Sequence, residues 1–416
     1  MDLPGYYEFC CRVKIIAGND ALERIPGALA GMNARKPMIV TDKGVSGAGL
    51  IDIVTDAIKG GVAVGAIADD VPPDSDLRVV NRLANTYRER GCDSLIAVGG
   101  GSVMDTAKGV NIVVSEKADD LMKFSGANAL KKALKPLIAI PTTAGTGSEV
   151  TLVAVIKDYE KHMKMAFVSY FLLPDLSIID PRMTLTLPPA ITAATGMDAL
   201  SHAVEAYTCL AKNPLSDAHA LAAIDLIRAN LVNVTKNPGD LNGRLAMASA
   251  ATLAGMAFSN SMVGMVHTIG HSVGSVCGAP HGACMAIILP YGLEYNKHKN
   301  GHLTEELLLP LAGAKVYTAT PKDERTEQVI ALIRQMNQDL HDATGGRHAR
   351  FFKEVLDREG KPMVPKEKLS NIAKTALSDA SIFYNPEELD YDDFLMVLDA
   401  AWEGNPLDTS RIKKGQ

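Results

Sequence analysis

Between about residues 37 and 140 the sequence alternates short apolar or β-branched runs with amphipathic stretches, and this alternation strongly limits the possible folds. We expect strands at 37–41, 62–68, 94–98 and 136–140, and helices at 47–59, 75–90 and 103–113. Parallel strands joined by helical crossovers need a sheet that is covered on both faces. The pattern therefore predicts an α/β domain with an open, doubly wound, Rossmann-like parallel sheet, with ligands at the carboxyl ends of its strands.

After about Pro188 strand-like runs become rare, and helical spacing continues to the end of the chain. Prolines at positions 181, 188 and 189 break helices and indicate an extended connection. We therefore expect two domains, an α/β domain of residues 1–187 and an all-α domain of residues 188–416.

Composition and charge exclude several kinds of partner. The chain has 42 Lys plus Arg and 48 Asp plus Glu, a net charge of −6, so no global positive field attracts nucleic acid or a membrane surface. The most apolar stretch, 245–289, contains His, Asn and Ser residues that a bilayer-spanning segment would carry only at high cost. We expect buried helices there.

The N-terminal residues and the cysteines favour a cytoplasmic location. Residues 1–9 are acidic and aromatic, without the basic and apolar regions of a secretion signal. Six cysteines in no CxxC pattern indicate reduced thiols in a chain of this length.

Two loops follow predicted strands and suit phosphate groups. Gly99, Gly100, Gly101 and Ser102 lie between the strand at 94–98 and a helix, where glycines allow close backbone approach and the helix N-terminus offers unpaired N–H groups. The loop 141–149, rich in Thr and Gly, follows the strand at 136–140. Each loop alone could be an ordinary turn, and the first is not a G-x-G-x-x-G fingerprint, but together they suggest a dinucleotide.

Asp42 follows the strand at 37–41, at the sheet edge where the adenosine ribose of such a dinucleotide would lie. A carboxylate there accepts hydrogen bonds from the ribose hydroxyls and repels a 2′-phosphate, which favours NAD over NADP. The alternative is that Asp42 only caps a helix or ends a strand.

Histidines and an aspartate recur at helical spacing in the second half of the chain. Asp198 and His202 are four residues apart, His267 and His271 repeat that spacing, and His281 follows in Pro-His-Gly. Imidazoles and a carboxylate from apolar helices need a partner, which a divalent metal would supply. A lone histidine would be a satisfied core residue, but three lie within 15 residues. Spacing does not decide whether His271 coordinates the metal or acts in another way.

These loops and the Asp and His motifs resemble those of the iron-dependent, group III alcohol dehydrogenases. The matching segments, in the order of that family, are Gly99-Gly100-Gly101-Ser102-x-x-Asp105-x-x-Lys108, 141–149, Asp180-Pro181, 195–207, His267-x-x-x-His271-x-x-Gly274 and Pro280-His281-Gly282. The resemblance spans roughly residues 10 to 400 and implies an N-terminal dinucleotide-binding domain and a C-terminal helical domain that binds metal and substrate, an architecture like that of dehydroquinate synthase.

The resemblance also assigns residues to the site. It implies Asp198, His202, His267 and His281 as metal ligands, with His271 beside the nicotinamide and available for proton relay. It implies as cofactor-binding residues Asp42 at the adenosine ribose, Gly100, Gly101, Ser102, Thr142 and Thr143 at the phosphates, Thr146, Val155 and Lys164 near the nicotinamide half, and also Gly99 and Asp105.

These expectations describe an NAD-linked, metal-dependent oxidation of small primary alcohols and reduction of the matching aldehydes. Nitrogen and oxygen ligands suit Fe²⁺ or Zn²⁺, so the choice of Fe²⁺ rests on the resemblance, as does a homodimer or larger homo-oligomer. Val153 stands where some diol-active relatives have Asn, so we expect simple aliphatic alcohols to be preferred over diols.

The alternative is an NAD- and metal-dependent lyase of the dehydroquinate synthase type. Its phosphorylated sugar acid would require a cluster of basic side chains near the metal. Between Asp198 and His281 the basic residues are Lys212, Arg228, Lys236 and Arg244, all away from the predicted ligands, which disfavours the lyase.

Overall fold

A computed structural model describes residues 4–160 and 163–412, and these residues form two compact units. One unit is Cys10–Leu187, and the other is Pro188–Gln416 together with Met1–Phe9. Residues 1–9 were expected in the α/β domain, whereas the described residues that precede Cys10 group with the helices.

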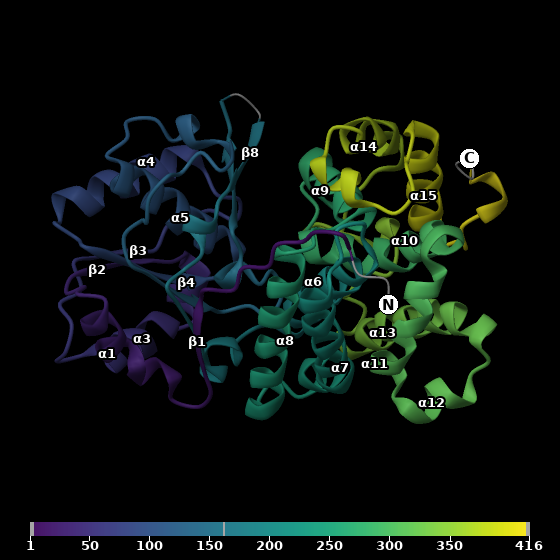
Figure 1. The fold of residues 1–416 in the computed structure, drawn as a ribbon, viewed down its shortest axis with the longest axis horizontal. Coiled ribbons are helices and arrows are strands. Elements are labelled where there is room, and N and C mark those ends of the chain that lie inside the picture. Colours follow the sequence, from purple (N-terminus) through teal and green to yellow (C-terminus); the bar gives the residue numbers. More distant parts are fainter. Residues whose placement is uncertain (1–3, 161–162, 413–416) are drawn as a thin grey trace. The chain divides into compact units, whose positions relative to one another are not determined.

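The first unit is built on a parallel sheet (Figure 1). Its strands are β1 (Lys14–Ala17), β2 (Pro37–Val40), β3 (Ala66–Ala68), β4 (Ser94–Gly99), β6 (Leu137–Pro141) and β9 (Leu176–Ile179). Among the described residues they form a six-stranded sheet in the order β1-β9-β6-β4-β2-β3, and every neighbouring pair is parallel. The predicted doubly wound parallel sheet is confirmed.

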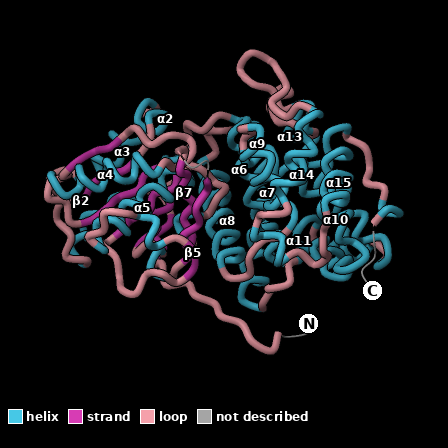
Figure 2. The backbone as a smooth tube through the Cα atoms, turned by 90° about the horizontal axis from the view of Figure 1, so that it is seen from above, coloured by secondary structure: helices cyan, strands magenta, loops and turns pink. Residues whose placement is uncertain are grey.

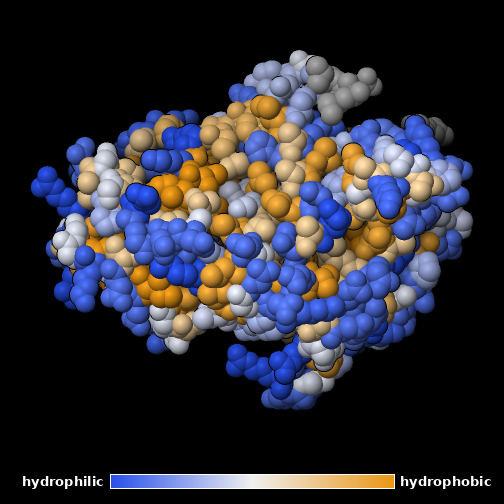
Figure 3. Space-filling view, turned by 90° about the horizontal axis from the view of Figure 1, so that it is seen from below, coloured by the Kyte–Doolittle hydropathy of each residue, from blue (hydrophilic) through white to orange (hydrophobic). Residues whose placement is uncertain are grey.

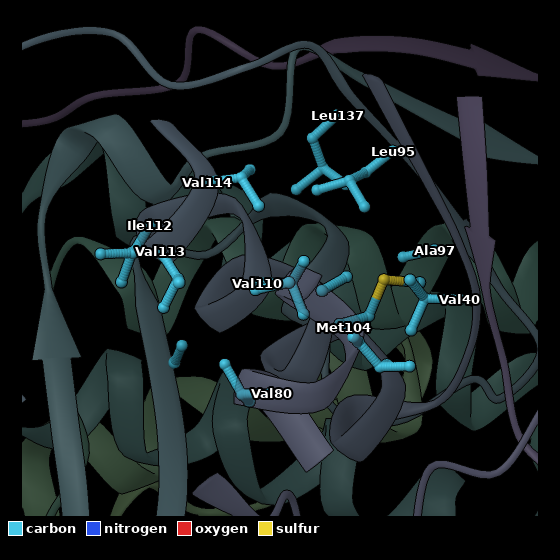
Figure 4. Packing of buried hydrophobic residues seen from close by; sticks show 14 of the residues in the cluster. Val40, Val80, Leu95, Ala97, Met104, Val110, Ile112, Val113, Val114 and Leu137 are labelled. Carbon is cyan, nitrogen blue, oxygen red and sulfur yellow. The ribbon is translucent and has the colours of Figure 1, made fainter. Parts of the chain in front are cut away.

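Helices cover both faces of this sheet, because side chains alternate between the faces along each strand. The helices are α1 (Ile25–Gly31), α2 (Lys43–Gly47), α3 (Leu50–Ile58), α4 (Leu77–Glu89) and α5 (Gly101–Glu116). Val40 and Leu95 point to the α4 and α5 face, where they meet Val80, Met104 and Val110 (Figure 4). Ile39, Ile96 and Ile138 point to the opposite face and pack with residues of α1 and α3, such as Leu29 and Val54. Both cores are thus fixed by the period of two along buried strands.

Some predicted elements differ from the structure. The helix expected at 47–59 corresponds to α3 alone, because Gly49, with a left-handed φ of 75°, separates it from the short helix α2, which was not expected. The strand expected at 62–68 is shortened to β3. A three-stranded sheet of β5 (Gly126–Ala127), β7 (Val153–Asp158) and β8 (Met163–Val168) was not anticipated, nor were the edge strand β1 and its neighbour β9, because these runs are short or partly polar.

The second unit is helical, as predicted, and Figure 2 shows helices and loops there. Its helices are α6 (Pro189–Thr208), α7 (Pro214–Lys236), α8 (Leu241–Ser259), α9 (Met265–Cys277), α10 (His281–Thr304), α11 (Leu308–Ala312), α12 (Ala314–Ala319), α13 (Arg325–Ala343), α14 (Leu369–Ala376) and α15 (Tyr391–Glu403). Across the described residues, no helix has both the length and the apolarity needed to span a bilayer. Hydrophobic residues form separate patches among hydrophilic ones on the face shown in Figure 3.

Small residues let α6 and the first turn of α10 approach closely. A Cβ atom added at Gly282 would lie 2.5 Å from the carbonyl oxygen of Ala194 and 2.8 Å from its carbonyl carbon. Both atoms belong to the backbone of α6, so they cannot move aside as a flexible side chain would. The packing of α10 against α6 therefore requires glycine at position 282.

We expect Gly282→Ala to destabilise the metal-free protein by about 1–3 kcal/mol, the usual cost of overpacking. The matched control is Gly301→Ala in the same helix, where the nearest atom to an added Cβ, outside the neighbouring backbone, is 3.7 Å away. That control should be neutral or stabilising by up to about 1 kcal/mol. Urea unfolding of both variants measures the difference, and equal stabilities would contradict the role of this contact.

Candidate metal centre and cofactor site

Three helices of the second unit bring the predicted metal ligands together. Asp198 and His202 lie one turn apart on α6, His267 lies in the first turn of α9, and His281 is the first residue of α10. Ligand atoms of Asp198, His267 and His281 all lie within 4.8 Å of one another. The expected grouping of these side chains, from segments up to 83 residues apart by number, is present in the structure.

Asp198 lies at the centre of the cluster. Its Oδ1 atom is 3.2 Å from His281 Nε2, 3.9 Å from His267 Nε2 and 3.9 Å from His202 Nδ1. The rings of His202 and His267 stack with their centroids 4.4 Å apart, and the other face of His202 stacks on Phe258 at 4.1 Å. His202 therefore directs Nδ1 at the same carboxylate oxygen at which His267 and His281 direct Nε2.

Two buried nitrogen atoms of this cluster, His202 Nδ1 and His267 Nε2, have no hydrogen-bond partner among the described residues. A buried polar atom without a partner costs free energy, so such an atom calls for an explanation. A divalent cation held by one carboxylate oxygen and imidazole nitrogens supplies it, because these are ordinary ligands of Fe²⁺ and Zn²⁺. The residues present fit a metal ion.

Burial sets the charge states in the cluster. It lowers the pKa of His202 to about 3, and it also lowers the pKa of His267 well below the usual value, with help from the nearby His281 and His271. Burial alone would raise the pKa of Asp198, but the surrounding imidazoles together hold it below its usual range. At neutral pH the cluster therefore has an ionised Asp198 carboxylate and neutral imidazoles at His202 and His267, the states that bind a cation.

Glu205 is a residue of this site that the sequence analysis missed. It lies on α6 three residues after His202 and seven after Asp198, so all three share one helix face. Its buried carboxylate forms a hydrogen bond with His267 Nδ1, the ring nitrogen that does not face Asp198. The spacing of Asp198, His202 and Glu205 at i, i+4 and i+7 could have identified Glu205 from the sequence.

His271 lies one turn after His267 and is partly exposed. Its Nδ1 atom is 2.9 Å from Asp379 Oδ2, and its ring stacks on that of His281 with centroids 5.5 Å apart. It is outside the group of three whose ligand atoms converge. Asp379 comes from a loop more than a hundred residues away, and no sequence pattern pointed to it.

The predicted cofactor residues of the sheet unit gather at the carboxyl ends of three adjacent strands. Asp42 follows β2, Gly100 follows β4, and Thr142 follows β6, and these strands are neighbours in the sheet. From β2 the chain passes to β3 on one side and to β4 on the other, so the strand order reverses between β2 and β4. Ligands of open α/β sheets bind at such a reversal.

The two predicted phosphate loops touch. Gly99, the last residue of β4, pairs with Pro141, the last of β6. A Cβ atom at Gly100 would lie 3.3 Å from Thr143 Oγ1, and one at Gly101 would lie 3.1 Å from Thr146 Cγ2. Gly100 precedes α5, and no side chain caps that helix N-terminus. Side chains here would fill the space beside the helix N-terminus, so the glycines suit a phosphate group.

Several other predicted cofactor residues have protein partners. Asp42 accepts a hydrogen bond from Val45 N at 2.9 Å and so caps α2, as the structural alternative anticipated. The Ser102 hydroxyl donates to the carbonyl of Pro73.

Asp105 acts within the protein as well. Its carboxylate accepts hydrogen bonds from Ser148 Oγ at 3.1 Å and from Val155 N at 3.0 Å, so it orients the edge of β7. Val155 is itself partly exposed there. The side chain of Lys164 lies outside the described residues.

Lys108 also fixes the segment 148–153, which contains Ser148, a partner of Asp105. Its buried ammonium group donates to the carbonyls of Ser148, Thr151 and Val153 at 2.8–2.9 Å and contacts the hydroxyls of the first two. Burial lowers the pKa of Lys108 to about 8. Lys108 was expected only as part of the motif, without a role. Its place on the apolar face of a helix could have indicated a buried structural lysine.

Comparisons with known proteins identify the family. The profile described as "Iron-containing alcohol dehydrogenase" matches residues 13–181, and the profile described as "Fe-containing alcohol dehydrogenase family, C-terminal" matches residues 192–402. The chain belongs to the iron-containing alcohol dehydrogenase family, a family of oxidoreductases. The resemblance drawn from the sequence motifs is confirmed.

Individual relatives match over most of the chain. It is 32% identical to the NAD-dependent methanol dehydrogenase of Bacillus methanolicus, over 92% of this chain and 96% of that one. It is 36% identical to the 1,3-propanediol dehydrogenase of Klebsiella pneumoniae, over 86% and 89% of the two chains. The solved structure of an alcohol dehydrogenase from Oenococcus oeni aligns with a TM-score of 0.88 at 33% identity, over 95% of this chain and all of that one.

The low pKa of His202 predicts how acid affects the metal-free protein. The unfolded chain binds a proton to this histidine below about pH 6.5, whereas the folded protein does not until about pH 3, so stability falls as pH falls through that window. From pH 7 to 5 the loss from His202 is about 2 kcal/mol.

Urea unfolding in EDTA at both pH values tests this, with His202→Gln as the comparison. The variant should lose about 2 kcal/mol less between pH 7 and 5 than the parent protein, since titrating groups away from the cluster cancel in the comparison. Parallel pH dependences would show that His202 titrates normally in the folded state.

Proposed function

We propose that this protein oxidises small primary alcohols, and reduces the matching aldehydes, by hydride transfer to or from the nicotinamide of NAD. The observation that carries the proposal is the convergence of Asp198, His267 and His281, with His202 beside them, in an apolar helical unit of an iron-containing alcohol dehydrogenase. The sheet unit would bind the dinucleotide, and the helical unit would hold the metal.

Asp198, His202, His267 and His281 would hold the metal ion, Fe²⁺ by family or Zn²⁺ by ligand chemistry. A bound divalent ion supplies Lewis acidity, which lowers the pKa of an alcohol hydroxyl and polarises an aldehyde carbonyl. The protein supplies a single negative charge, from Asp198, so a divalent ion would keep a net positive charge to act on the substrate oxygen. The apolar surroundings of these ligands strengthen that interaction by excluding water.

His271 is suited to move a proton. Its Nδ1 atom is held by Asp379, which orients the ring and favours the imidazolium when a proton arrives at Nε2. The partial exposure of its side chain gives that proton a route to solvent. We assign His271 the proton relay and not a place among the metal ligands.

The cofactor would lie along the carboxyl ends of β2, β4 and β6. The α5 N-terminus and the backbone of 99–102 would bind the pyrophosphate, with Thr142, Thr143 and Thr146 beside it. Asp42 would accept hydrogen bonds from the adenosine ribose. Asp105 and Lys108 would act indirectly, by fixing the loop 148–155.

The lyase alternative needs basic side chains for a phosphorylated sugar acid. Three of the four basic residues between Asp198 and His281 have other partners: Lys212 pairs with Asp217, Arg228 with Asp225, and Arg244 donates to Thr192 and Pro238. This arrangement favours the dehydrogenase.

We further propose aliphatic alcohols over diols as substrates, from Val153 at the start of β7, and a homodimer or larger homo-oligomer, from family resemblance. A cytoplasmic location accords with six cysteines that are all free thiols.

The experiment that tests the function follows NADH formation from short alcohols and diols. Metal-stripped protein is reloaded anaerobically with Fe²⁺ or Zn²⁺ and assayed with NAD and with NADP. We expect one metal to restore activity with NAD, and 1-propanol or 1-butanol to be oxidised at least as efficiently as 1,2-propanediol. No turnover with either metal, despite tight NAD binding, would favour the lyase.

Two variants separate the histidine roles. His267→Ala should lose metal and activity together while NADH still binds, whereas His271→Ala should retain metal and lose activity. Metal content by mass spectrometry and NADH fluorescence measure these outcomes. Equal loss of metal in both variants would make His271 a ligand.

Asp42→Ser tests cofactor choice. Serine keeps the cap of α2 but removes the negative charge that repels a 2′-phosphate. We expect the ratio of kcat/KM for NAD over NADP to fall by about tenfold, an electrostatic difference of ~1.4 kcal/mol. Asp56→Ser, on the same unit but away from β2, is the control for general charge effects. An unchanged ratio would restrict Asp42 to its helix-capping role.

A further inference from the structure

The first turn of α9 carries His267, and distant side chains satisfy its backbone donors. Glu205 Oε1 accepts from Gly264 N at 3.0 Å and from Val266 N at 2.8 Å, and Glu205 Oε2 accepts from His267 N at 3.3 Å. Asn385 Oδ1 accepts from Met265 N at 3.1 Å. These four N–H groups have no partner inside a helix, so two buried side chains cap the whole turn.

Glu205 also contacts the imidazole of His267, at Nδ1. Both oxygens of Glu205 already accept backbone N–H groups, as an ionised carboxylate does, and an ionised carboxylate only accepts hydrogen bonds, so the contact at Nδ1 places the ring proton on that nitrogen. The other ring nitrogen, Nε2, is then a bare lone pair, and it is the atom that faces Asp198 Oδ1 at 3.9 Å. One carboxylate thus fixes the backbone, the ring orientation and the tautomer of the same residue.

The local backbone is shaped to admit these groups. A Cβ atom at Gly264 would lie 2.8 Å from Asn385 Oδ1 and 3.3 Å from Glu205 Oε1. Asn385 is held in turn, because it exchanges hydrogen bonds with the side-chain amide of Asn296 and donates to the carbonyl of Glu387 at 2.7 Å. The cap of α9 is therefore a built feature and not a chance contact.

We propose that Glu205 is the positioning residue of the metal centre, which selects the metal-binding tautomer of His267 and locks the α9 turn that carries it. This inference rests on the proposed function, because it assumes that His267 binds a metal through Nε2. Carboxylates that orient ligating histidines raise metal affinity without touching the ion.

The informative substitution is Glu205→Gln, which keeps the shape of the side chain. Its amide oxygen can still accept from the backbone of α9, but its NH₂ group would face Nδ1 and donate to it. The imidazole proton then moves to Nε2, the atom needed for the metal. The substitution therefore reverses the tautomer while leaving most of the helix cap in place.

The matched control is Asn385→Ala. Asn385 caps the same turn through Met265 N, but no contact joins it to the His267 ring in the described residues. The Asn385→Ala variant therefore measures how much a weaker cap of α9 by itself lowers metal affinity.

Co²⁺ and Zn²⁺ are titrated into metal-free protein against a competing chelator, and urea unfolding gives the stability of each metal-free variant. We expect Glu205→Gln to raise the metal Kd about 10–100-fold, and Asn385→Ala to raise it by clearly less at an equal or greater loss of stability. An unchanged Kd in Glu205→Gln, or equal increases in both variants, would overturn the proposal.

A second measurement does not depend on any variant folding. Nitrogen-15 chemical shifts of the His267 ring in metal-free protein report which nitrogen carries the proton, and we expect Nδ1. A proton on Nε2 would overturn the proposal. If the parent protein binds neither Co²⁺ nor Zn²⁺ at this cluster, the proposed function itself fails, which the same titration distinguishes from a failure of the role of Glu205.

Discussion

The buried carboxylate of Asp198 is the constraint on which the arrangement of the helical unit depends. Its side chain is about 2% exposed, and an ionised carboxylate buried in this way without partners would cost several kcal/mol. Three imidazoles from three helices surround it and hold its pKa low. The helices α6, α9 and α10 must therefore meet at this point, and residues such as Gly282 and Gly264 are small because they allow that meeting.

Burial and hydrogen bonding also distinguish the histidines of the cluster. His202 and His267 are buried and have ring nitrogens without hydrogen-bond partners, whereas His271 is partly exposed and held by Asp379. In the proposed function, its exposure lets His271 exchange a proton with solvent, whereas the buried His202 and His267 would bind the metal. His267 and His271 therefore differ in environment although they lie only one turn apart on α9.

The sequence predicted the parallel sheet because buried strands with β-branched residues, such as β2 and β4, recur between amphipathic helices. It predicted the ligand cluster because Asp198 and His202, and then His267 and His271, repeat a helical spacing. It did not predict Asp379 or Asn385, which reach the site from irregular segments more than a hundred residues away in the chain, where no periodicity exists to follow. The break at Gly49 was missed for a related reason, since a single glycine within a helical pattern does not reveal its φ angle.

The pairing of Gly99 with Pro141 at the ends of β4 and β6 has an entropic consequence. Both phosphate loops leave the sheet from ladder-bonded residues, and Lys108 and Asp105 tie the second loop to α5. The loops therefore lose little conformational freedom when a ligand arrives, because folding has already ordered them. In a preorganised site of this kind, the free energy of contacts with a dinucleotide would contribute to affinity, because little of it is needed to order the backbone.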